Sequence, residues 1–346
     1  MKILVTGAAG FIGAHIVQQA QAVGHVVIGV DLMLPLAHGE DAQAPAGVRL
    51  LDVRDVAQWE ELLVGVDVVC HQSAVVGSGI SVDDFPAYAS HNDLGTAALL
   101  AAMARRGVRR LVQASSMVVY GEGRYRCADH GAVSPPVRPA AALDAGDFEV
   151  RCPTCARALT WAVVPEEAPL DPRSAYAASK VAQEHYANAW ARQVDGAVIS
   201  LRYHNVYGPG MPRDTPYAGV AALFRSSLAR GESPRVFEDG AQMRDFVHVA
   251  DVARANLLAL AAVGGVAGPF NVCSGSPISI AQVATHLGAA SGISPVTTGE
   301  YRLGDVRHVV ASPARAERDL GFVAAIGPEQ GLAEFAHAPL REASPA

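Results

Sequence analysis

Short apolar runs alternate with Ala-rich segments of helical spacing along the first part of the chain. Each run is bounded by glycine or polar residues and has the length of a buried strand. The runs that we expect to be strands are Ile3–Val5, Val26–Val30, Val66–Val69, Arg110–Ala114 and Ala197–Leu201. Because strands that alternate with helices are joined by crossover connections, the pattern predicts an α/β fold with a doubly wound parallel sheet.

Two regions depart from this alternation. Beyond about Arg213 the chain has Gly/Pro-rich turns between mixed strands and helices, so we expect residues 213–346 to form mainly a smaller C-terminal substrate-binding lobe. Residues 122–167 are rich in Pro, Ala, Arg and Cys and have neither a strand nor a helix period. We expect them to form a loop-rich Cys/His insert in a sheet domain made of residues 1–121 and 168–212.

Composition and charge exclude several classes of protein. Half of the 346 residues are apolar, and the formal net charge is -7 with no basic block, which disfavours nucleic acid as a partner. No apolar run reaches the roughly 18–20 residues that cross a bilayer, and the opening residues do not have the pattern of a signal peptide. We therefore expect a soluble, cytoplasmic protein with no membrane partner.

A glycine-rich turn follows the first predicted strand and opens a helix. It reads Gly7-Ala8-Ala9-Gly10-Phe11-Ile12-Gly13. Such a turn lets a pyrophosphate approach backbone N–H groups at the positive end of the helix. Asp31 ends the next strand 18 residues later, where a carboxylate binds the adenosine ribose hydroxyls and repels a 2′-phosphate. Leu32 and Met33 offer no cation for a 2′-phosphate. The sequence therefore predicts that a Rossmann sheet binds NAD in preference to NADP.

Asp52 and Val53 follow the third strand and are candidates for contact with the adenine edge. An isolated Asp at such a position is more often a turn residue, so both interpretations stay open.

Tyr176 and Lys180 are candidate catalytic residues, because a spacing of four places them on one face of a helix. A nearby ammonium and an oxidised nicotinamide favour the phenolate, so we expect a lowered pKa that makes Tyr176 a base at neutral pH. This spacing is common by chance, but Ser116 follows a predicted strand and would face the crevice where α/β sheets bind ligands. The neighbouring Ser115 has the same chemistry.

These segments together resemble the extended short-chain dehydrogenase/reductase family, specifically its nucleotide-sugar epimerases and dehydratases. The resemblance is specific because the segments occur in the family's order, and it covers nearly the whole chain except the insert. They are Gly7–Gly13, Asp31, His71–Ala74, Asn92–Thr96, Ser115–Gly121, Tyr176 with Lys180, Leu201–Pro209, Arg244–Val249 and Arg302–Asp305. The resemblance selects Ser116 as the catalytic hydroxyl and implies a homodimer formed through helices of the sheet domain.

The resemblance also implies most of the ligand contacts. Arginines are expected to clamp the diphosphate of a nucleotide-diphosphate sugar, since guanidinium groups form charge-assisted, bidentate hydrogen bonds. The further cofactor contacts are Ser73, Ala74, Asn92 and Tyr203, beside Tyr176 and Lys180. The substrate contacts are Ser116, Met117, Asn205, Val220, Arg235, Phe237, Arg244 and Arg302, of which Arg235 and Phe237 are expected near the nucleobase.

The residues after the catalytic hydroxyl discriminate between the reactions of the family. Its dehydratases carry an Asp-Glu pair there and its UDP-glucuronate decarboxylases a Glu, whereas this chain has Met117 and Val118. We therefore predict an isomerase: Tyr176 removes the proton of the sugar 4-hydroxyl while NAD takes the C4 hydride, and the hydride then returns to the opposite face. A dTDP-6-deoxyhexose such as dTDP-L-rhamnose is slightly favoured over a UDP-hexose.

Two alternatives stay open at this point. One is a nucleotide-sugar 4-ketoreductase or dehydrogenase with a net redox change. The other is a non-catalytic NAD sensor or scaffold, which the retention of Ser116, Tyr176 and Lys180 disfavours. His204 stands where the family usually has Phe, and it is either a donor near the nicotinamide or sugar or a packed core residue.

The insert contains two Cys/His pairs of metal-ligand spacing. Cys127 and His130 are followed after about twenty residues by Cys152 and Cys155, which matches a structural zinc site. The alternative is three incidental reduced thiols and a surface histidine. Because the insert has few apolar residues, metal binding would supply free energy for its folding.

Overall fold

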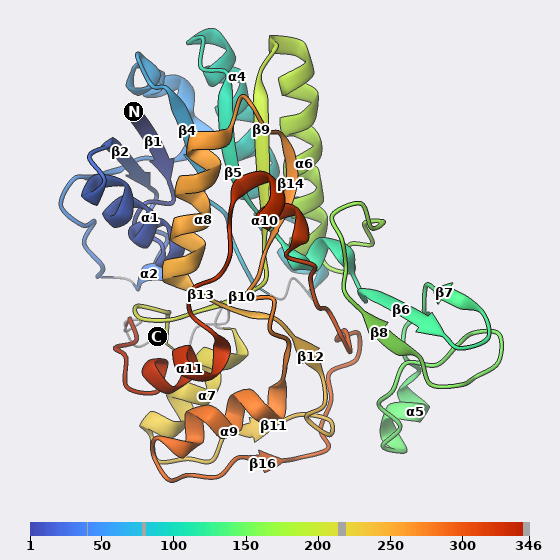
Figure 1. The fold of residues 1–346 in the computed structure, drawn as a ribbon. Coiled ribbons are helices and arrows are strands. Elements are labelled where there is room, and N and C mark those ends of the chain that lie inside the picture. The colour runs from blue at the N-terminus through green and yellow to red at the C-terminus, as the bar shows by residue number, and fades with distance from the viewer. Residues whose placement is uncertain (40, 78–80, 214–218, 342–346) are drawn as a thin grey trace.

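A seven-stranded parallel sheet forms the centre of the molecule (Figure 1). The computed structural model describes residues 1–39, 41–77, 81–213 and 219–341. In spatial order the strands are β14 (Gly268–Val272), β9 (Ala197–Tyr203), β5 (Arg110–Ser116), β4 (Val68–His71), β1 (Lys2–Thr6), β2 (Val26–Asp31) and β3 (Val48–Leu50). The order reverses between β1 and β4, so the predicted doubly wound parallel sheet is confirmed.

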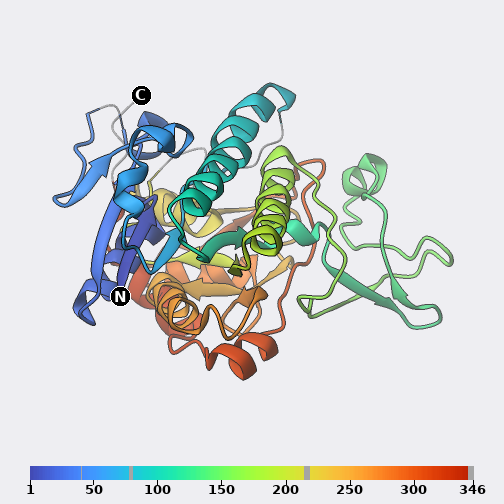
Figure 2. The same ribbon diagram turned by 90° about the horizontal axis from the view of Figure 1, so that it is seen from above.

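Helices cover both faces of this sheet (Figure 2). One face packs against α1 (Phe11–Ala22), α8 (Val249–Ala262) and α10 (Ala314–Leu320), and the other against α4 (Gly95–Arg105) and α6 (Ala175–Val194). Each of these helices has at least one alanine on its buried side, beside larger apolar residues, which lets it approach the strands closely. The hydroxyl of Ser174 caps α6 by accepting a hydrogen bond from the N–H of Ala177 at 3.2 Å.

The C-terminal lobe consists of short strand pairs and three helices around a third hydrophobic cluster. The pairs are β10 (Asn205–Tyr207) with β13 (Phe246–His248), β11 (Arg235–Val236) with β16 (Val296–Thr297), and β12 (Met243–Arg244) with β15 (Ile278–Ser279). The helices are α7 (Val220–Ala229), α9 (Ile280–Ala289) and α11 (Pro328–Phe335). Three elements beyond residue 213, namely α8, α10 and β14, pack into the sheet domain instead of the lobe.

The insert extends from the side of the molecule (Figure 1). Its strands β6 (Arg124–Cys127), β7 (Gly131–Val133) and β8 (Thr160–Ala162) form an antiparallel sheet, and α5 (Ala140–Asp144) lies beyond β7. Its hydrophobic cluster has only five buried members: Tyr125, Cys127, Val150, Cys152 and Leu159. These three strands have only three or four residues each, and the sequence pattern did not predict them.

The remaining helical segments are short. They are α2 (Pro35–His38), α3 (Phe85–Tyr88), the 3₁₀ segments Val53–Gln58, Glu60–Leu63, Val82–Asp84 and Met117–Tyr120, and the π-helical segment Ala89–Leu94. Within the described part of the chain, no helix combines the length and the hydropathy needed to cross a membrane.

Candidate active site

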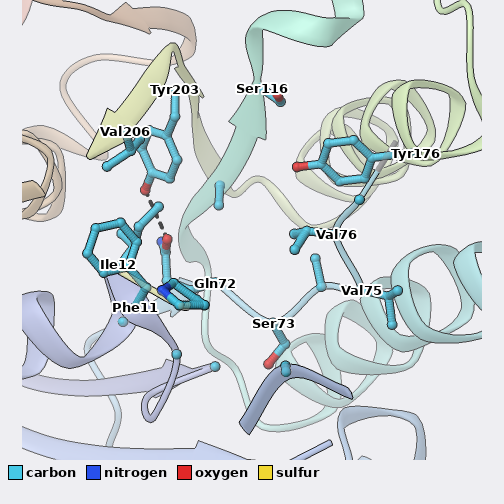
Figure 3. A pocket seen from close by; sticks show the side chains of 18 of the residues that line it. Phe11, Ile12, Gln72, Ser73, Val75, Val76, Ser116, Tyr176, Tyr203 and Val206 are labelled. Atoms are coloured by element: carbon cyan, nitrogen blue, oxygen red, sulfur yellow. Dashed lines mark hydrogen bonds between the residues drawn. The ribbon is translucent and has the colours of Figure 1, made fainter. Parts of the chain in front are cut away.

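A cavity of about 660 Å³ lies at the carboxyl ends of the sheet strands (Figure 3). This edge is where open α/β sheets bind their ligands. Most of the residues predicted from sequence line it together. They are Gly7, Gly10, Phe11, Ile12, Gly13, Asp31, Asp52, Val53, Ser73, Ala74, Ser116, Tyr176, Lys180, Tyr203, Asn205 and Arg302.

The glycine turn leaves no room for side chains. Gly7 has a φ of +67°, and a Cβ there would lie 2.8 Å from the backbone nitrogen of Ser73. A Cβ on Gly13 would lie 2.0 Å from the carbonyl oxygen of Gly7, so Gly13 lets α1 pack against the turn. Among the described residues no side chain caps α1 at Gly10. The positive end of α1 therefore faces the cavity, which fits a dinucleotide pyrophosphate.

Asp31 has the environment of an ionised ribose-binding carboxylate. Its oxygens accept hydrogen bonds from the backbone N–H of Ala9 at 3.0 Å and of Met33 at 2.8 Å, and His38 Nε2 lies 3.5 Å away. Burial raises the pKa of Asp31, but His38 and the two N–H groups outweigh it and the net pKa is lowered. The carboxylate is therefore charged at neutral pH.

The structure adds basic groups near Asp31 that the local sequence did not predict. His38 lies beside it, and Arg341 lines the same cavity and donates to the carbonyl of Ala9 at 2.9 Å and of Ala37 at 3.2 Å. Arg341 is 310 residues from Asp31 in sequence, so no local pattern could have indicated it.

Asp52 has the local role of a turn residue while also lining the cavity. Its carboxylate accepts hydrogen bonds from the backbone and the guanidinium of Arg54, and it caps the 3₁₀ segment Val53–Gln58. Both interpretations made from the sequence are therefore compatible with the structure.

Asn92 and Tyr203 support the cofactor side of the cavity differently. Asn92 is buried, and it holds the backbone of Val75 through two hydrogen bonds and donates to Ser179 Oγ at 2.9 Å. It positions the loop behind the cavity and is not among the described lining residues. Tyr203 lines the cavity and donates to Gln72 Oε1 at 2.9 Å (Figure 3).

The structure distinguishes the two candidate serines. Ser115 is buried and donates to Glu184 Oε1 at 2.5 Å, so its hydroxyl is engaged within the protein. Figure 3 shows Ser116 on the cavity wall and the phenol of Tyr176 directed into the cavity. Ser116 is therefore the hydroxyl available to a ligand, as the family resemblance implies.

The ionisation of the candidate catalytic pair differs from the expectation. Burial raises the pKa of Tyr176 to about 12, with a smaller opposing contribution from Ser116. Lys180 Nζ donates to the carbonyl of Ala114 at 3.0 Å and lies 5.8 Å from the Tyr176 ring centroid. Burial lowers the pKa of Lys180 to about 8. The expected depression of the Tyr176 pKa, which included the charge of an oxidised nicotinamide, is not found for the protein alone, because desolvation of the phenolate outweighs the hydrogen bond with Ser116.

Of the eight predicted substrate contacts, Ser116, Asn205 and Arg302 line the cavity, and within the described chain the other five do not. Arg244 donates to the carbonyls of Met243, Val306 and Arg307. Its guanidinium therefore holds backbone in place instead of facing the cavity, contrary to the prediction that it clamps a diphosphate.

The other four lie nearby or at the surface. Arg235 is exposed and pairs with Glu300 at 2.5 Å, while the Phe237 ring lies 5.4 Å from the Arg302 guanidinium. Val220 starts α7 directly after the lining residue Gly219. Met117 follows Ser116 at the end of β5.

His204 lies in the cavity wall, but it is buried, and neither ring nitrogen makes a hydrogen bond of ordinary geometry to a described residue. Burial lowers the pKa of His204 to about 3, so the ring is neutral. Its buried nitrogens favour the interpretation as a packed residue over that of a ligand donor.

The four predicted metal ligands of the insert converge. Cys127 Sγ and Cys152 Sγ lie 3.4 and 3.5 Å from His130 Nδ1, and the thiols of Cys127 and Cys155 are 3.6 Å apart. All four ligand atoms lie within 4.8 Å of one another. A tetrahedral zinc site with ordinary bond lengths has ligand separations of about 3.5–3.8 Å, so the geometry fits zinc.

The fold and the cavity define the class of protein: a dinucleotide-binding enzyme of the α/β class with a Ser–Tyr–Lys set beside its cofactor cleft. Residues 3–142 and 163–273 match the NAD dependent epimerase/dehydratase family, and the chain belongs to this family. The segment between the two matched ranges lies in the insert and contains Cys152 and Cys155, so this half of the Cys/His cluster lies outside the family match.

Relatives of similar length match this chain over nearly its whole length. The dTDP-L-rhamnose 4-epimerase of Burkholderia thailandensis is 34% identical over 96% of this chain and 93% of its own length. The UDP-glucose 4-epimerase of Mycolicibacterium smegmatis is 32% identical over 96% and 97%. The structure of the Thermotoga maritima UDP-glucose 4-epimerase with UDP-glucose has a TM-score of 0.78 at 30% identity and 97% coverage of both chains.

A second similar structure contains a nucleotide sugar together with NAD. MoeE5 in complex with UDP-glucuronic acid and NAD has a TM-score of 0.76 at 31% identity, and the match covers 97% of this chain and 98% of MoeE5.

Proposed function

We propose that this protein is an isomerase, an NAD-dependent nucleotide-sugar 4-epimerase. The observation that supports the proposal is that one cavity is lined both by Ser116 and Tyr176 and by the glycine turn at the open N-terminus of α1. The names of the two curated relatives point to the same reaction. The apolar pair Met117 and Val118 favours epimerisation over the eliminations that need an acid next to the catalytic serine.

Three residues of the chain transfer the proton, orient the substrate and supply charge. The Tyr176 phenol oxygen accepts the proton of the sugar 4-hydroxyl when the sugar is oxidised and returns it when the ketone is reduced. Ser116 orients that hydroxyl through a hydrogen bond. Lys180 supplies positive charge that favours the phenolate. Bound NAD would supply the acceptor and donor for the C4 hydride and a second positive charge near the phenol.

For the substrate, we propose a nucleoside-diphosphate hexose bound with its diphosphate toward Arg302 and its sugar near Ser116. Between nucleotides we favour dTDP and a 6-deoxyhexose, by analogy with the relative from Burkholderia thailandensis. UDP-hexoses are the alternative, by analogy with UDP-glucose 4-epimerases.

A panel assay tests the function and separates it from the alternatives. Purified protein is incubated with dTDP-L-rhamnose, UDP-glucose and UDP-glucuronic acid while products and NADH absorbance are followed. Interconversion of C4 epimers without net NADH supports the proposal. Stoichiometric NADH would establish a dehydrogenase instead, and the absence of turnover across the panel would favour an NAD sensor.

We also infer that Cys127, His130, Cys152 and Cys155 bind a structural zinc ion. Their separations support this, because they match a closed tetrahedral shell. The backbone N–H groups of Asp129 and His130 lower the pKa of Cys127 and so favour the thiolate that binds metal. Metal analysis of the purified protein, with one equivalent of zinc expected, tests this.

The homodimer stays a prediction, with the paired helices α4 and α6 as its expected surface. Leu94, which directly precedes α4, and Tyr186 on α6 are exposed and fit such a contact. Light scattering of the purified chain tests it, with twice the chain mass expected. The cytoplasmic location is likewise a prediction.

A further inference from the structure

We propose that the zinc-binding element positions the segment of residues 302–308 through a buried bridge at Glu238, so that metal occupancy sets the affinity for the nucleotide sugar. The proposal rests on the proposed function and the proposed metal site. It goes beyond both because it connects them.

Glu238 bridges two arginines from different parts of the chain. Its Oε1 accepts a hydrogen bond from Arg138 of the insert at 2.8 Å, and its Oε2 accepts one from Arg307 of the lobe at 2.7 Å. The three residues are 3%, 6% and 0% exposed. Glu238 also has a φ of +53°, a strained conformation for a residue with a side chain. The carboxylate is therefore held at a position whose backbone alone would favour glycine.

The insert also contacts Arg307 and the neighbouring His308 from segments close to both pairs of proposed metal ligands. Glu149 lies three residues before Cys152 and accepts a hydrogen bond from Arg307 at 2.6 Å. Tyr125 lies two residues before Cys127, and its hydroxyl accepts a hydrogen bond from the backbone N–H of His308 at 3.0 Å. Each metal-ligating segment thus has its own contact with the lobe.

The same contacts reach the wall of the cavity. Arg138 Nη2 also donates to the carbonyl of Asp305 at 2.8 Å, and Asp305 and Arg302 line the cavity. On the other side Arg244 holds the carbonyls of Val306 and Arg307. The segment 302–308 is therefore held by Arg244 of the lobe and by Arg138 of the insert. Of these two arginines, Arg138 belongs to the zinc-binding element.

The charges explain why this bridge should act as a unit. Arg307 meets Glu149, Glu238 and Asp239, so a fully buried guanidinium is neutralised by groups from both the insert and the lobe. Removing one partner from a buried, hydrogen-bonded charge network leaves the others uncompensated. If the insert loses its metal and its fold, the segment 302–308 loses that support.

The test measures binding and needs no turnover. Calorimetry with zinc-loaded, NAD-saturated protein gives the Kd for UDP, dTDP and their hexose conjugates in the unaltered chain, Arg138→Ala and Arg138→Lys. We expect about tenfold weaker nucleotide-sugar binding for Arg138→Ala, with NAD and zinc content unchanged and kcat within about threefold. Arg138→Lys should recover part of the affinity. Arg151→Ala is the control, since this exposed insert arginine pairs only with Asp147 among the described acids.

Metal removal supplies the second arm. Chelation should weaken nucleotide-sugar binding of the unaltered chain at least as much as Arg138→Ala does, because it also releases the contacts of Glu149 and Tyr125. The two changes together should be less than additive, since both act on the segment 302–308. Equal affinity before and after chelation would overturn the inference, and so would additive effects. If Arg138→Ala does not fold, chelation of the unaltered chain decides alone. Failure of the unaltered protein to bind any of the nucleotides would refute the proposed function instead.

Discussion

The cofactor end of the cavity and the insert are built on different physical principles. The glycine turn and the catalytic pair are fixed by a sheet packed between two large hydrophobic clusters, so their geometry follows from burial of apolar surface. The insert has a cluster of five buried residues, and in our proposal its order depends on four metal ligands and on ion pairs to the lobe. Substitutions of catalytic side chains should therefore lower activity without unfolding the first region. Substitutions of the proposed metal ligands should instead alter the structure of the second region.

The largest expected effect is on the catalytic pair. Tyr176→Phe removes the proton acceptor, and we expect epimerase activity to fall by about 10³-fold or more. NAD content and thermal stability should stay the same, because the ring still packs. Tyr186→Phe on the exposed face of the same helix is the matched control. Activity of Tyr176→Phe within tenfold of the unaltered chain would contradict the assignment.

A methyl group on the glycine turn should be nearly as severe. Gly13→Ala places a Cβ 2.0 Å from the Gly7 carbonyl, so α1 must shift away from the turn, and we expect NAD affinity to fall about 100-fold. Fluorescence titration with NADH measures this. Gly327→Ala, where a Cβ meets nothing within 4 Å, should bind NADH normally; equal affinity of the two variants would show that the turn tolerates the methyl group.

Loss of one proposed metal ligand should disturb the insert and leave the sheet domain intact. Cys152→Ser is expected to lose the zinc and to become sensitive to proteolysis within residues 122–167, because the insert cannot fold on its small core. NAD binding should persist, since the sheet domain does not depend on the metal. Cys273→Ser, at a buried cysteine outside the cluster, should retain zinc. Full zinc content in Cys152→Ser would refute the assigned ligand set.

The pH profile tests the charge of Lys180. Its pKa is lowered from the usual 10.5 to about 8, so the ammonium is present below that pH and is lost above it. We expect kcat/KM to fall by about tenfold per pH unit above about 8. Lys180→Arg should move this fall to higher pH, because guanidinium stays protonated. A profile that is flat to pH 10 would argue against a role for the charge.

The smallest effect is expected at Arg235. Its pair with Glu300 is exposed, and such pairs contribute about 0–1 kcal/mol. Arg235→Ala should therefore change thermal stability and the Kd for UDP or dTDP very little. A tenfold loss of nucleotide affinity would restore the nucleobase contact that the sequence predicted and the structure places outside the cavity.

The same contrast explains which features could be predicted from the sequence. The strands of the sheet are apolar and separated by helical spacing, so β1, β2, β4, β5 and β9 were predicted close to their observed positions. The glycine turn, Asp31 and the Tyr176–Lys180 pair are local patterns with their own chemistry. The convergence of Cys127, His130, Cys152 and Cys155 was also predicted, because their spacing is itself a signal.

The interactions that the sequence did not reveal connect distant residues. Arg341 near Asp31 and the Glu238 bridge between Arg138 and Arg307 exist only after folding. Arg244 fits a diphosphate-binding motif in sequence, yet the backbone carbonyls of Val306 and Arg307 engage it. The choice between Ser115 and Ser116 likewise needed the partner of Ser115, which is Glu184 on α6.

The central claim is transient hydride transfer at C4 within one cavity. The most direct test is incubation of the purified protein with a substrate from the panel that carries deuterium at C4, followed by NMR of the isolated epimer. We predict that the product keeps the deuterium at C4, because the hydride leaves to NAD and returns without exchange. Replacement of that deuterium by solvent hydrogen, or conversion without change at C4, would contradict the account.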